Sequence, residues 1–150
     1  MGLQSAVNVK AAAATPGDKA TVGQSVYAPV TRLAGEGGVT AGSFAWQDEA
    51  GALVSHGENA PRGLVERSVT TAGLGTGLTV PRGGAVTLAV KGDYWVTSAE
   101  AAQEGGQVYA VKTDGSVTAS DGGGSAVAAE GWRFRTSGEA GDTVIISNWS

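Results

Sequence analysis

After residue 38, apolar and polar residues alternate, in places unevenly, in short runs of three to eight residues. Such alternation is typical of β-strands that bury one face. The runs are separated by turns rich in glycine, and long helix-forming stretches are absent. Many short strands joined by glycine-rich turns favour a sandwich or a barrel, so the pattern predicts an all-β fold.

The pattern also predicts where individual elements lie. Before residue 97 we expect strands at residues 39–46, 52–55, 64–69, 78–80, 85–90 and 94–96. Thr97-Ser-Ala-Glu100 then has the spacing of the capping box that begins a helix. We therefore expect at most one short helical turn, over residues 97–103, ended by Gly105 and Gly106.

The clearest hairpin signal is Asp114-Gly115, which lies between two alternating runs. This dipeptide is typical of a two-residue type I′ turn. Such a turn predicts cross-strand pairs of Lys112 with Val117, Val111 with Thr118, Ala110 with Ala119 and Tyr109 with Ser120.

A second hairpin is expected near the C-terminus, between residues 132–136 and 143–149. Its alternation puts Trp132, Phe134 and Thr136 on one face of the strand. Arg133 and Arg135 then lie on the other face.

Residues 42–51, GSFAWQDEAG, combine two aromatic residues with two acids. The spacing places Phe44 and Trp46 on one face of a strand and Ala45 on the other. Asp48 and Glu49 follow directly, and as neighbours on a strand they would point to opposite faces. We interpret them as turn residues at the end of the strand rather than as paired catalytic acids.

Residues 1–38 differ in composition from the remainder of the chain. They mix small residues with prolines and glycines, and such residues bury little apolar area. We expect an extended N-terminal arm over residues 1–38, with one short strand at residues 7–10, and a β-sandwich domain over residues 39–150. The alternative is a flexible terminus without a role.

Length and charge narrow the possible functions. With 150 residues the chain is long enough for one domain with its own core. It has no cysteine, which excludes disulfides and thiolate chemistry. The formal net charge is −4 and the ten Lys and Arg residues are scattered, so no nucleic-acid-binding surface is expected. No apolar run approaches the ~20 residues of a membrane helix, and no signal-peptide pattern is seen, so we expect a cytoplasmic product without a membrane partner.

Residues suited to catalysis or metal binding are few. His56 is the single histidine, and no G-x-S-x-G nucleophile motif is present. Gly73, Gly75 and Gly77 lack both the Rossmann spacing and a Walker lysine. The sequence therefore predicts no catalytic, cofactor-binding or metal-binding residue, and a protein that is not an enzyme.

The tryptophans leave two interpretations open. Trp46, Trp95 and Trp132 lie in alternating apolar runs, which predicts a place in the core. Trp149, near the C-terminal end, needs a packing partner to be ordered. The alternative is a carbohydrate-binding or adhesin-like β-module, with Tyr94 and Trp95 as an exposed platform.

Six segments occur in an order that is similar to that of a known protein family. They are VNVKAAAATPGD, GSFAW, APRGLVERS, VPRGGAVTLAVKGDYWV, GGQVYAVKTDGSV and GDTVIISNW. Together they resemble the structural cement (capsid decoration) proteins of tailed bacteriophages. The resemblance covers nearly the whole chain, and residues 86–96 and 105–110 carry most of it. Residues 115–131 are least like the family.

This resemblance implies a jelly-roll-like β-sandwich on the outside of a capsid, where it bridges major capsid protein subunits as an oligomer, most simply a homodimer. It implies no cofactor. An acidic protein suits the outer surface, because a protein close to the packaged genome would tend to be basic.

An arm that orders on binding can wrap neighbouring subunits. We therefore select Val7, Val9 and Lys10 of the arm for capsid contact. Arg62 and Arg67 are selected as charges that would steer the protein towards an acidic capsid surface.

Overall fold

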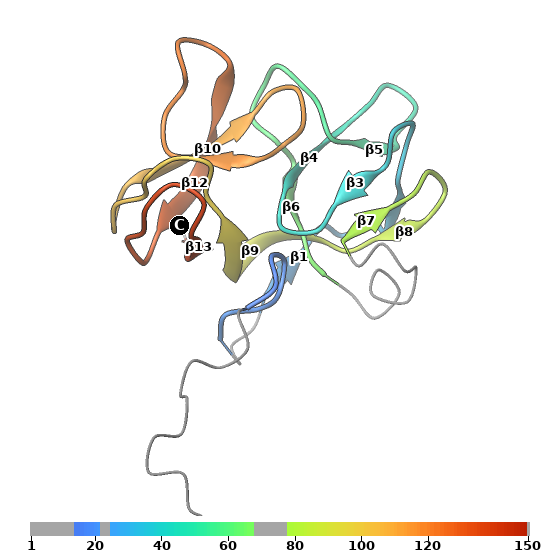
Figure 1. The fold of residues 1–150 in the computed structure, drawn as a ribbon. Helices are drawn as coiled ribbons and strands as arrows, with labels where there is room; N and C mark the ends of the chain where they lie inside the picture. The colour runs from blue at the N-terminus through green and yellow to red at the C-terminus, as the bar shows by residue number, and fades with distance from the viewer. Residues whose placement is uncertain (1–13, 22–24, 68–77, 150) are drawn as a thin grey trace, which may run out of the picture.

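The computed structural model describes residues 14–21, 25–67 and 78–149 (Figure 1). Within these ranges it contains strands and turns, and no helix of a length and hydrophobicity that would cross a membrane. The strands are β1 (Val26–Tyr27), β2 (Arg32–Leu33), β3 (Val39–Thr40), β4 (Phe44–Gln47), β5 (Leu53–Val54), β6 (Gly63–Val65), β7 (Thr79–Val80), β8 (Ala85–Val86), β9 (Leu88–Thr97), β10 (Gln107–Val111), β11 (Val117–Thr118), β12 (Ala126–Phe134) and β13 (Thr143–Asn148).

Most strands belong to one curled antiparallel sheet. Its order is β11-β10-β12-β13-β9-β6-β4-β5, and β1 also pairs with β9. Two small sheets, β2 with β8 and β3 with β7, complete the fold. In Figure 1, β10, β12 and β13 lie on one side of β9, and β3 to β8 lie on the other. The fold is the all-β, jelly-roll-like sandwich expected from the sequence.

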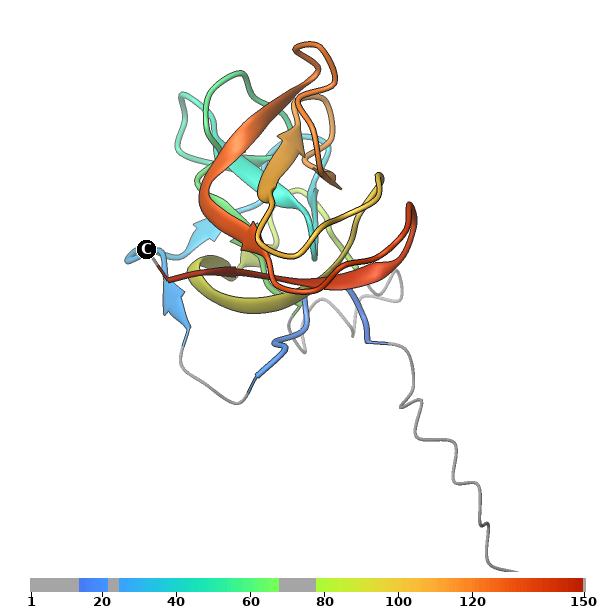
Figure 2. The ribbon, with the colours of Figure 1, turned by 90° about the vertical axis from the view of Figure 1, so that its left-hand side faces the viewer.

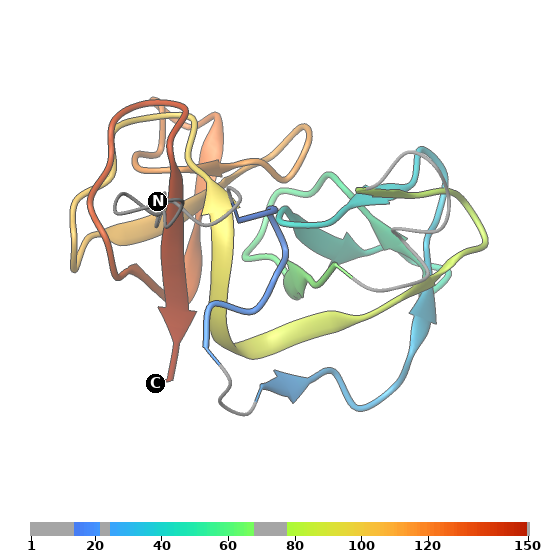
Figure 3. The same ribbon diagram turned by 60° about the horizontal axis from the view of Figure 1, so that its bottom comes forward.

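Strand β9 joins the two halves of the molecule, as Figure 3 shows. Residues 92–97 of this strand pair with β13, whereas residues 88 and 89 pair with β6. The sequence pattern predicted two strands here, at residues 85–90 and 94–96. The structure continues the strand through Gly92 and Asp93, because both residues pair with β13.

The core consists of two clusters that share strands β4 to β6. The first packs Phe44, Trp46 and Leu64 against residues of β9, β10, β12 and β13. The second packs Ala45 and Val65 against residues of β3, β7 and β8. The predicted faces of Phe44, Trp46 and Ala45 are thereby confirmed. Because both faces are covered, all residues of β5 and β6 are buried, and these strands are apolar rather than alternating.

Aromatic packing closes the first cluster. Phe44 is fully buried, and its ring meets that of Trp132 edge-on with centroids 5.7 Å apart. Such a contact adds about 0.5–1.5 kcal/mol to the stabilisation from buried area. The tryptophan belongs to the C-terminal hairpin, so this pair fastens β12 to β4 across the core.

The strand predicted at residues 39–46 was wrong, because the structure divides it into β3 and β4. In the intervening turn the Ser43 N–H donates to the Thr40 carbonyl at 3.1 Å. Gly42 has a φ of +82°, and a Cβ there would lie only 2.5 Å from the Cβ of Pro16. The break is therefore set by close approach of the N-terminal segment, which no local pattern encodes.

The helical turn predicted at residues 97–103 was also wrong. Thr97, the expected capping residue, is the last residue of β9, and the next residue, Ser98, donates from Oγ to the Glu100 carbonyl at 2.6 Å. The Glu100 carboxylate accepts hydrogen bonds from Thr118 Oγ1 and from Ser120 Oγ. These bonds, that from Thr118 foremost, hold the pKa of Glu100 below its ordinary value. The acid of the expected capping box therefore bonds to the end of β11.

The hairpin between β10 and β11 forms, but the predicted register was wrong. Tyr109 pairs with Thr118 and Ala110 with Val117. A type I′ turn needs positive φ at both central residues, and all described residues with positive φ are glycines. Gly115 instead lies against β4, where its carbonyl accepts a hydrogen bond of 2.8 Å from the Phe44 N–H. A contact between strands distant in sequence sets this register.

The C-terminal hairpin forms from β12 and β13 as predicted. Phe134 pairs with Ile146, Trp132 and Phe134 are buried, and Arg133 and Arg135 are exposed. The strand begins earlier than expected, at Ala126.

The described residues before residue 39 lie against the sheet. Trp95 accepts a hydrogen bond from the Gly17 N–H at 2.8 Å and donates one to the Asp18 carbonyl at 2.9 Å. Strands β1 and β2 then pair with β9 and β8. The strand predicted at residues 7–10 lies outside the described residues, and the boundary at residue 38 stays a prediction.

Candidate functional site

Large apolar side chains that remain exposed gather on residues 26–33, and one more lies near the C-terminus. Among the described residues they are Val26, Tyr27, Val30, Leu33 and Trp149. Val30 and Leu33 have 56% and 54% of their surface exposed. Single exposed apolar residues are ordinary, whereas a contiguous group marks an interaction surface. We call these five residues the apolar edge.

The pairing around β9 places β1 on the same side as β13. Ala89 pairs with Leu64 of β6 and also with Tyr27 of β1, so these two strands take opposite edges of β9. Strand β13 also lies opposite β6 in the order of the sheet. Strands β13 and β1 therefore follow one another along one edge of β9 (Figures 2 and 3).

This arrangement brings Trp149 to the start of β1. Strand β13 ends with Asn148 opposite Gly92, and Val26 lies opposite the next residue, Lys91. Trp149 Nε1 donates to Asp93 Oδ1 at 2.9 Å, which orients the exposed indole. Trp149 therefore lies close to the start of β1, where Val26 is also exposed.

A hollow of about 260 Å³ lies beside the apolar edge. Its lining includes the apolar residues Val30, Leu53, Val86 and Leu88 and the cations Arg32 and Arg62. The volume is just below the roughly 300–1,000 Å³ typical of small-molecule sites, so it suits one or two side chains.

The charge of this hollow is positive, although the protein is acidic. No Asp or Glu is among its lining residues. Arg32 Nη1 donates to the Gly51 carbonyl at 3.2 Å. In the described part of the chain the ion pairs are Arg67 with Asp18 and Lys112 with Glu58, so neither Arg32 nor Arg62 has a carboxylate partner there.

Side-chain hydrogen bonds fix the N-terminal segment beside this surface. Arg67 Nη1 lies 3.1 Å from Asp18 Oδ1. The buried Tyr94 hydroxyl donates to Glu66 Oε2 at 2.7 Å and lies 2.8 Å from Ser25 Oγ. Burial raises the pKa of the Tyr94 phenol well above its ordinary value. Asp18 and Ser25 are thereby joined to the residues that directly follow β6, Ser25 through Tyr94 of β9.

The residues selected from the sequence for capsid contact have different surroundings. Val7, Val9 and Lys10 lie outside the described residues. Arg62 lines the hollow, whereas Arg67 pairs with Asp18. The two arginines lie at opposite ends of β6, so the structure does not bring them into one cluster.

The sequence analysis did not identify the apolar edge. Residues 25–33, SVYAPVTRL, lack strict alternation and contain Pro29, so they were assigned to an arm. The available signal was the group of Val26, Tyr27, Val30 and Leu33, which are large apolar residues in a segment with no other core pattern.

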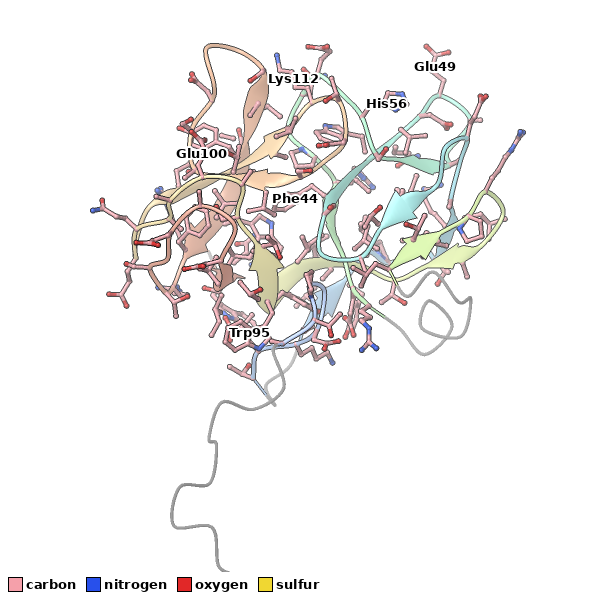
Figure 4. All side chains as sticks on the ribbon, viewed as in Figure 1. Phe44, Glu49, His56, Trp95, Glu100 and Lys112 are labelled. Carbon is pink, nitrogen blue, oxygen red and sulfur yellow. The ribbon has the colours of Figure 1, made fainter. Side chains whose placement is uncertain are left out.

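The residues considered for catalysis or metal binding do not form a cluster. Figure 4 shows His56 and Glu49 at the periphery, and both are exposed. Asp48 Oδ1 accepts a hydrogen bond of 2.9 Å from the Ala52 N–H, which confirms its place in a turn. The described ranges hold no group of three or more His, Asp or Glu side chains able to bind a metal ion. Residues 73–77 lie outside the described residues.

The structure separates the predicted aromatic platform. Trp46 and Trp132 are buried as predicted, and Trp95 is half-buried. The neighbouring Tyr94 is fully buried, because successive residues of a strand point to opposite faces. The prediction that Tyr94 and Trp95 form an exposed sugar platform was therefore wrong.

Comparison with known proteins gives a family match and a structural likeness. The family model described as structural cement protein (E217 gp24/Pam3 gp6) matches residues 3–148. A chain of the solved structure "The capsid of Myoviridae Phage XM1" has 20% sequence identity and a TM-score of 0.69, with 98% of this chain and 97% of that chain covered. At this identity the likeness shows a shared fold. A search of curated proteins found no significant match.

Proposed function

The chain belongs to the structural cement protein family of bacteriophages, and from this premise we propose that it binds the outer capsid surface and holds neighbouring major capsid protein subunits together. It is a capsid cement, or decoration, protein and a structural component of the virion. The family match over residues 3–148 carries this conclusion.

A cement stabilises the capsid because its binding to neighbouring subunits must be broken before those subunits can separate. A ligand that binds only the assembled state stabilises that state by mass action. The exposed apolar edge supplies area that a partner can remove from water. The net charge of −4 supports a place on the outer surface, away from the packaged genome.

The proposed contacts combine the arm with charged residues of the sandwich. Val7, Val9 and Lys10 would reach across the junction between capsid subunits. Arg62 is exposed beside the hollow and is free to steer association with an acidic surface. Arg67 would act chiefly by holding the N-terminal segment through Asp18.

We also propose that the protein is a homo-oligomer on the capsid, most simply a homodimer. Two linked sets of modest contacts bind more tightly than either set alone, because the second binds at a high effective concentration. A structural role of this kind uses no catalytic group or cofactor.

The test is binding to undecorated capsids of the protein's own phage. The purified protein is mixed with capsids, the particles are pelleted, and the temperature of DNA release is measured with and without it. Co-sedimentation at a fixed stoichiometry with a raised release temperature supports a cement. Binding without stabilisation contradicts the cementing role, and the absence of binding contradicts the proposal as a whole. Protease digestion of intact decorated particles checks that the bound protein lies outside.

A further inference from the structure

We propose that the hollow beside the apolar edge binds an extended segment of the major capsid protein. This segment carries a large apolar side chain next to a carboxylate. This inference rests on the proposed function and states the chemistry by which the cement recognises its partner.

Apolar contact is the first requirement on the occupant. Val86 and Leu88, which line the hollow, are only 3% and 5% exposed, so they form its inner wall. Val30 also lines it but is 56% exposed, so its outer surface has no cover in the described part of the chain. An apolar side chain that enters the hollow would remove this surface from water. The volume of about 260 Å³ fits one or two such side chains.

A carboxylate is the second requirement. Arg32 and Arg62 line the same hollow, and no acidic residue lines it. When an apolar partner displaces water from a guanidinium group, the charge needs a hydrogen-bonding anion in its place. Carboxylates meet this need well because they accept two parallel bonds from one arginine. A neutral or basic segment would leave both arginines without an anionic partner.

The third requirement is an extended backbone. Strand β1 pairs with β9 on one edge, and no strand pairs with its other edge in the described ranges. An exposed edge of this kind accepts an added strand, whose alternate side chains then enter neighbouring pockets. A segment laid along β1 would pass the mouth of the hollow, since Tyr27 is both part of β1 and part of the lining.

Charge reversal beside the hollow provides the first test. Arg62→Glu is compared with Arg133→Glu, which makes the same change at an exposed arginine on β12. We expect Arg62→Glu to weaken co-sedimentation with undecorated capsids roughly tenfold or more, and Arg133→Glu to leave it unchanged. Equal binding by both variants would overturn the proposal. Circular dichroism and a thermal melt verify that each variant is folded.

Site-specific crosslinking identifies the occupant. The photoreactive residue p-benzoylphenylalanine replaces Val30, the protein is bound to capsids and irradiated, and the crosslinked peptide is sequenced by mass spectrometry. A capsid-protein peptide with Asp or Glu beside a large apolar residue supports the proposal. A peptide from a second copy of this chain, a capsid peptide without an acid, or the absence of a crosslink on bound particles overturns it. These outcomes contradict the proposed occupant of the hollow but not the cement function. Failure of the wild-type protein to bind capsids would contradict both the occupant and the cement function.

Discussion

Arg67 Nη1 lies 3.1 Å from Asp18 Oδ1, and this ion pair joins residues 49 positions apart in the sequence. The two side chains are 34% and 36% exposed, so water screens the pair and its contribution to stability is small, about 0–1 kcal/mol. Its main effect is local, because it fixes the N-terminal segment to the end of β6.

Removal of this ion pair should therefore increase local opening of the N-terminal segment more than it lowers the stability of the whole fold. For Asp18→Ala we expect a loss of about 0.2–1 kcal/mol in the free energy of unfolding, measured by urea denaturation. Hydrogen exchange of the Gly17 and Ala20 amides, which donate to carbonyls of β9, should accelerate more strongly than exchange in the core. Glu36→Ala removes an equal charge from another exposed position and serves as the control. Unchanged exchange at Gly17 and Ala20 would contradict the role assigned to the pair.

Gly17 should tolerate no side chain. Its φ is +91° and that of Gly37 is +85°, so alanine strains the backbone at both, by about 1–2 kcal/mol. Only at Gly17 would the added Cβ meet backbone atoms, the amide nitrogens of Arg67 and Gly42, each at 2.9 Å. At Gly37 nothing lies within 4 Å. We expect Gly17→Ala to destabilise the protein by about 1–3 kcal/mol more than Gly37→Ala, and equal melting temperatures would count against this close approach.

Tyr94 should make stability depend on alkaline pH. Its phenol has a raised pKa in the folded protein, whereas in the unfolded chain it ionises near pH 10. Below that pH both states keep the proton and the full contribution is present. Above it the unfolded state loses the proton first, so the free energy of unfolding falls as the pH rises. Urea denaturation at several pH values between neutrality and pH 11 measures this slope.

Tyr94→Phe separates this effect from general alkaline damage. The variant should be about 1–3 kcal/mol less stable at neutral pH, because the hydrogen bond to Glu66 is lost. Its stability should then vary less above pH 10 than that of the wild-type protein. Tyr109→Phe keeps Tyr94 and should retain the wild-type slope. An identical slope in all three proteins would show that another group is responsible.

Deletion of residues 1–13 should abolish decoration without loss of stability. Every contact described for residues 14–21 remains, so the melting temperature should stay within error of that of the full chain. Deletion of residues 1–20 is a poorer test, because it also removes the Asp18–Arg67 pair and the bonds between Gly17 and Trp95. Co-sedimentation of the shorter deletion with capsids decides the point, and undiminished binding would exclude the arm as a contact.

The sequence predicts this fold best where the local pattern decides the structure. Phe44, Trp46, Trp132 and Phe134 were assigned to the correct faces because successive side chains of a strand alternate between its two faces. The prediction fails where contact with a segment distant in sequence determines the local structure. Glu100, for instance, bonds to the end of β11 rather than to the start of a helix.

The candidate site was only partly predictable for a related reason. Arg62 was selected as a steering charge, and it is exposed beside the hollow, whereas its role in capsid contact stays a prediction. Val30 and Leu33 were not selected, because an apolar residue in the sequence gives no sign of whether another segment covers it. Their exposure follows from how β1 and β2 lie on β9 and β8, which depends on long-range pairing.

Two parts of the N-terminal segment contact opposite edges of β9. Ala20 bonds to Asp93 on the edge opposite β13, whereas β1 pairs on the edge that β13 shares. Both contacts lie near Gly92, where a Cβ would lie 2.8 Å from Ser25 Oγ. If the N-terminus is held by the capsid as proposed, tension on it would be passed to β9, the strand that contributes residues to both core clusters. The mechanical strength of such an attachment would then depend on the centre of the sheet.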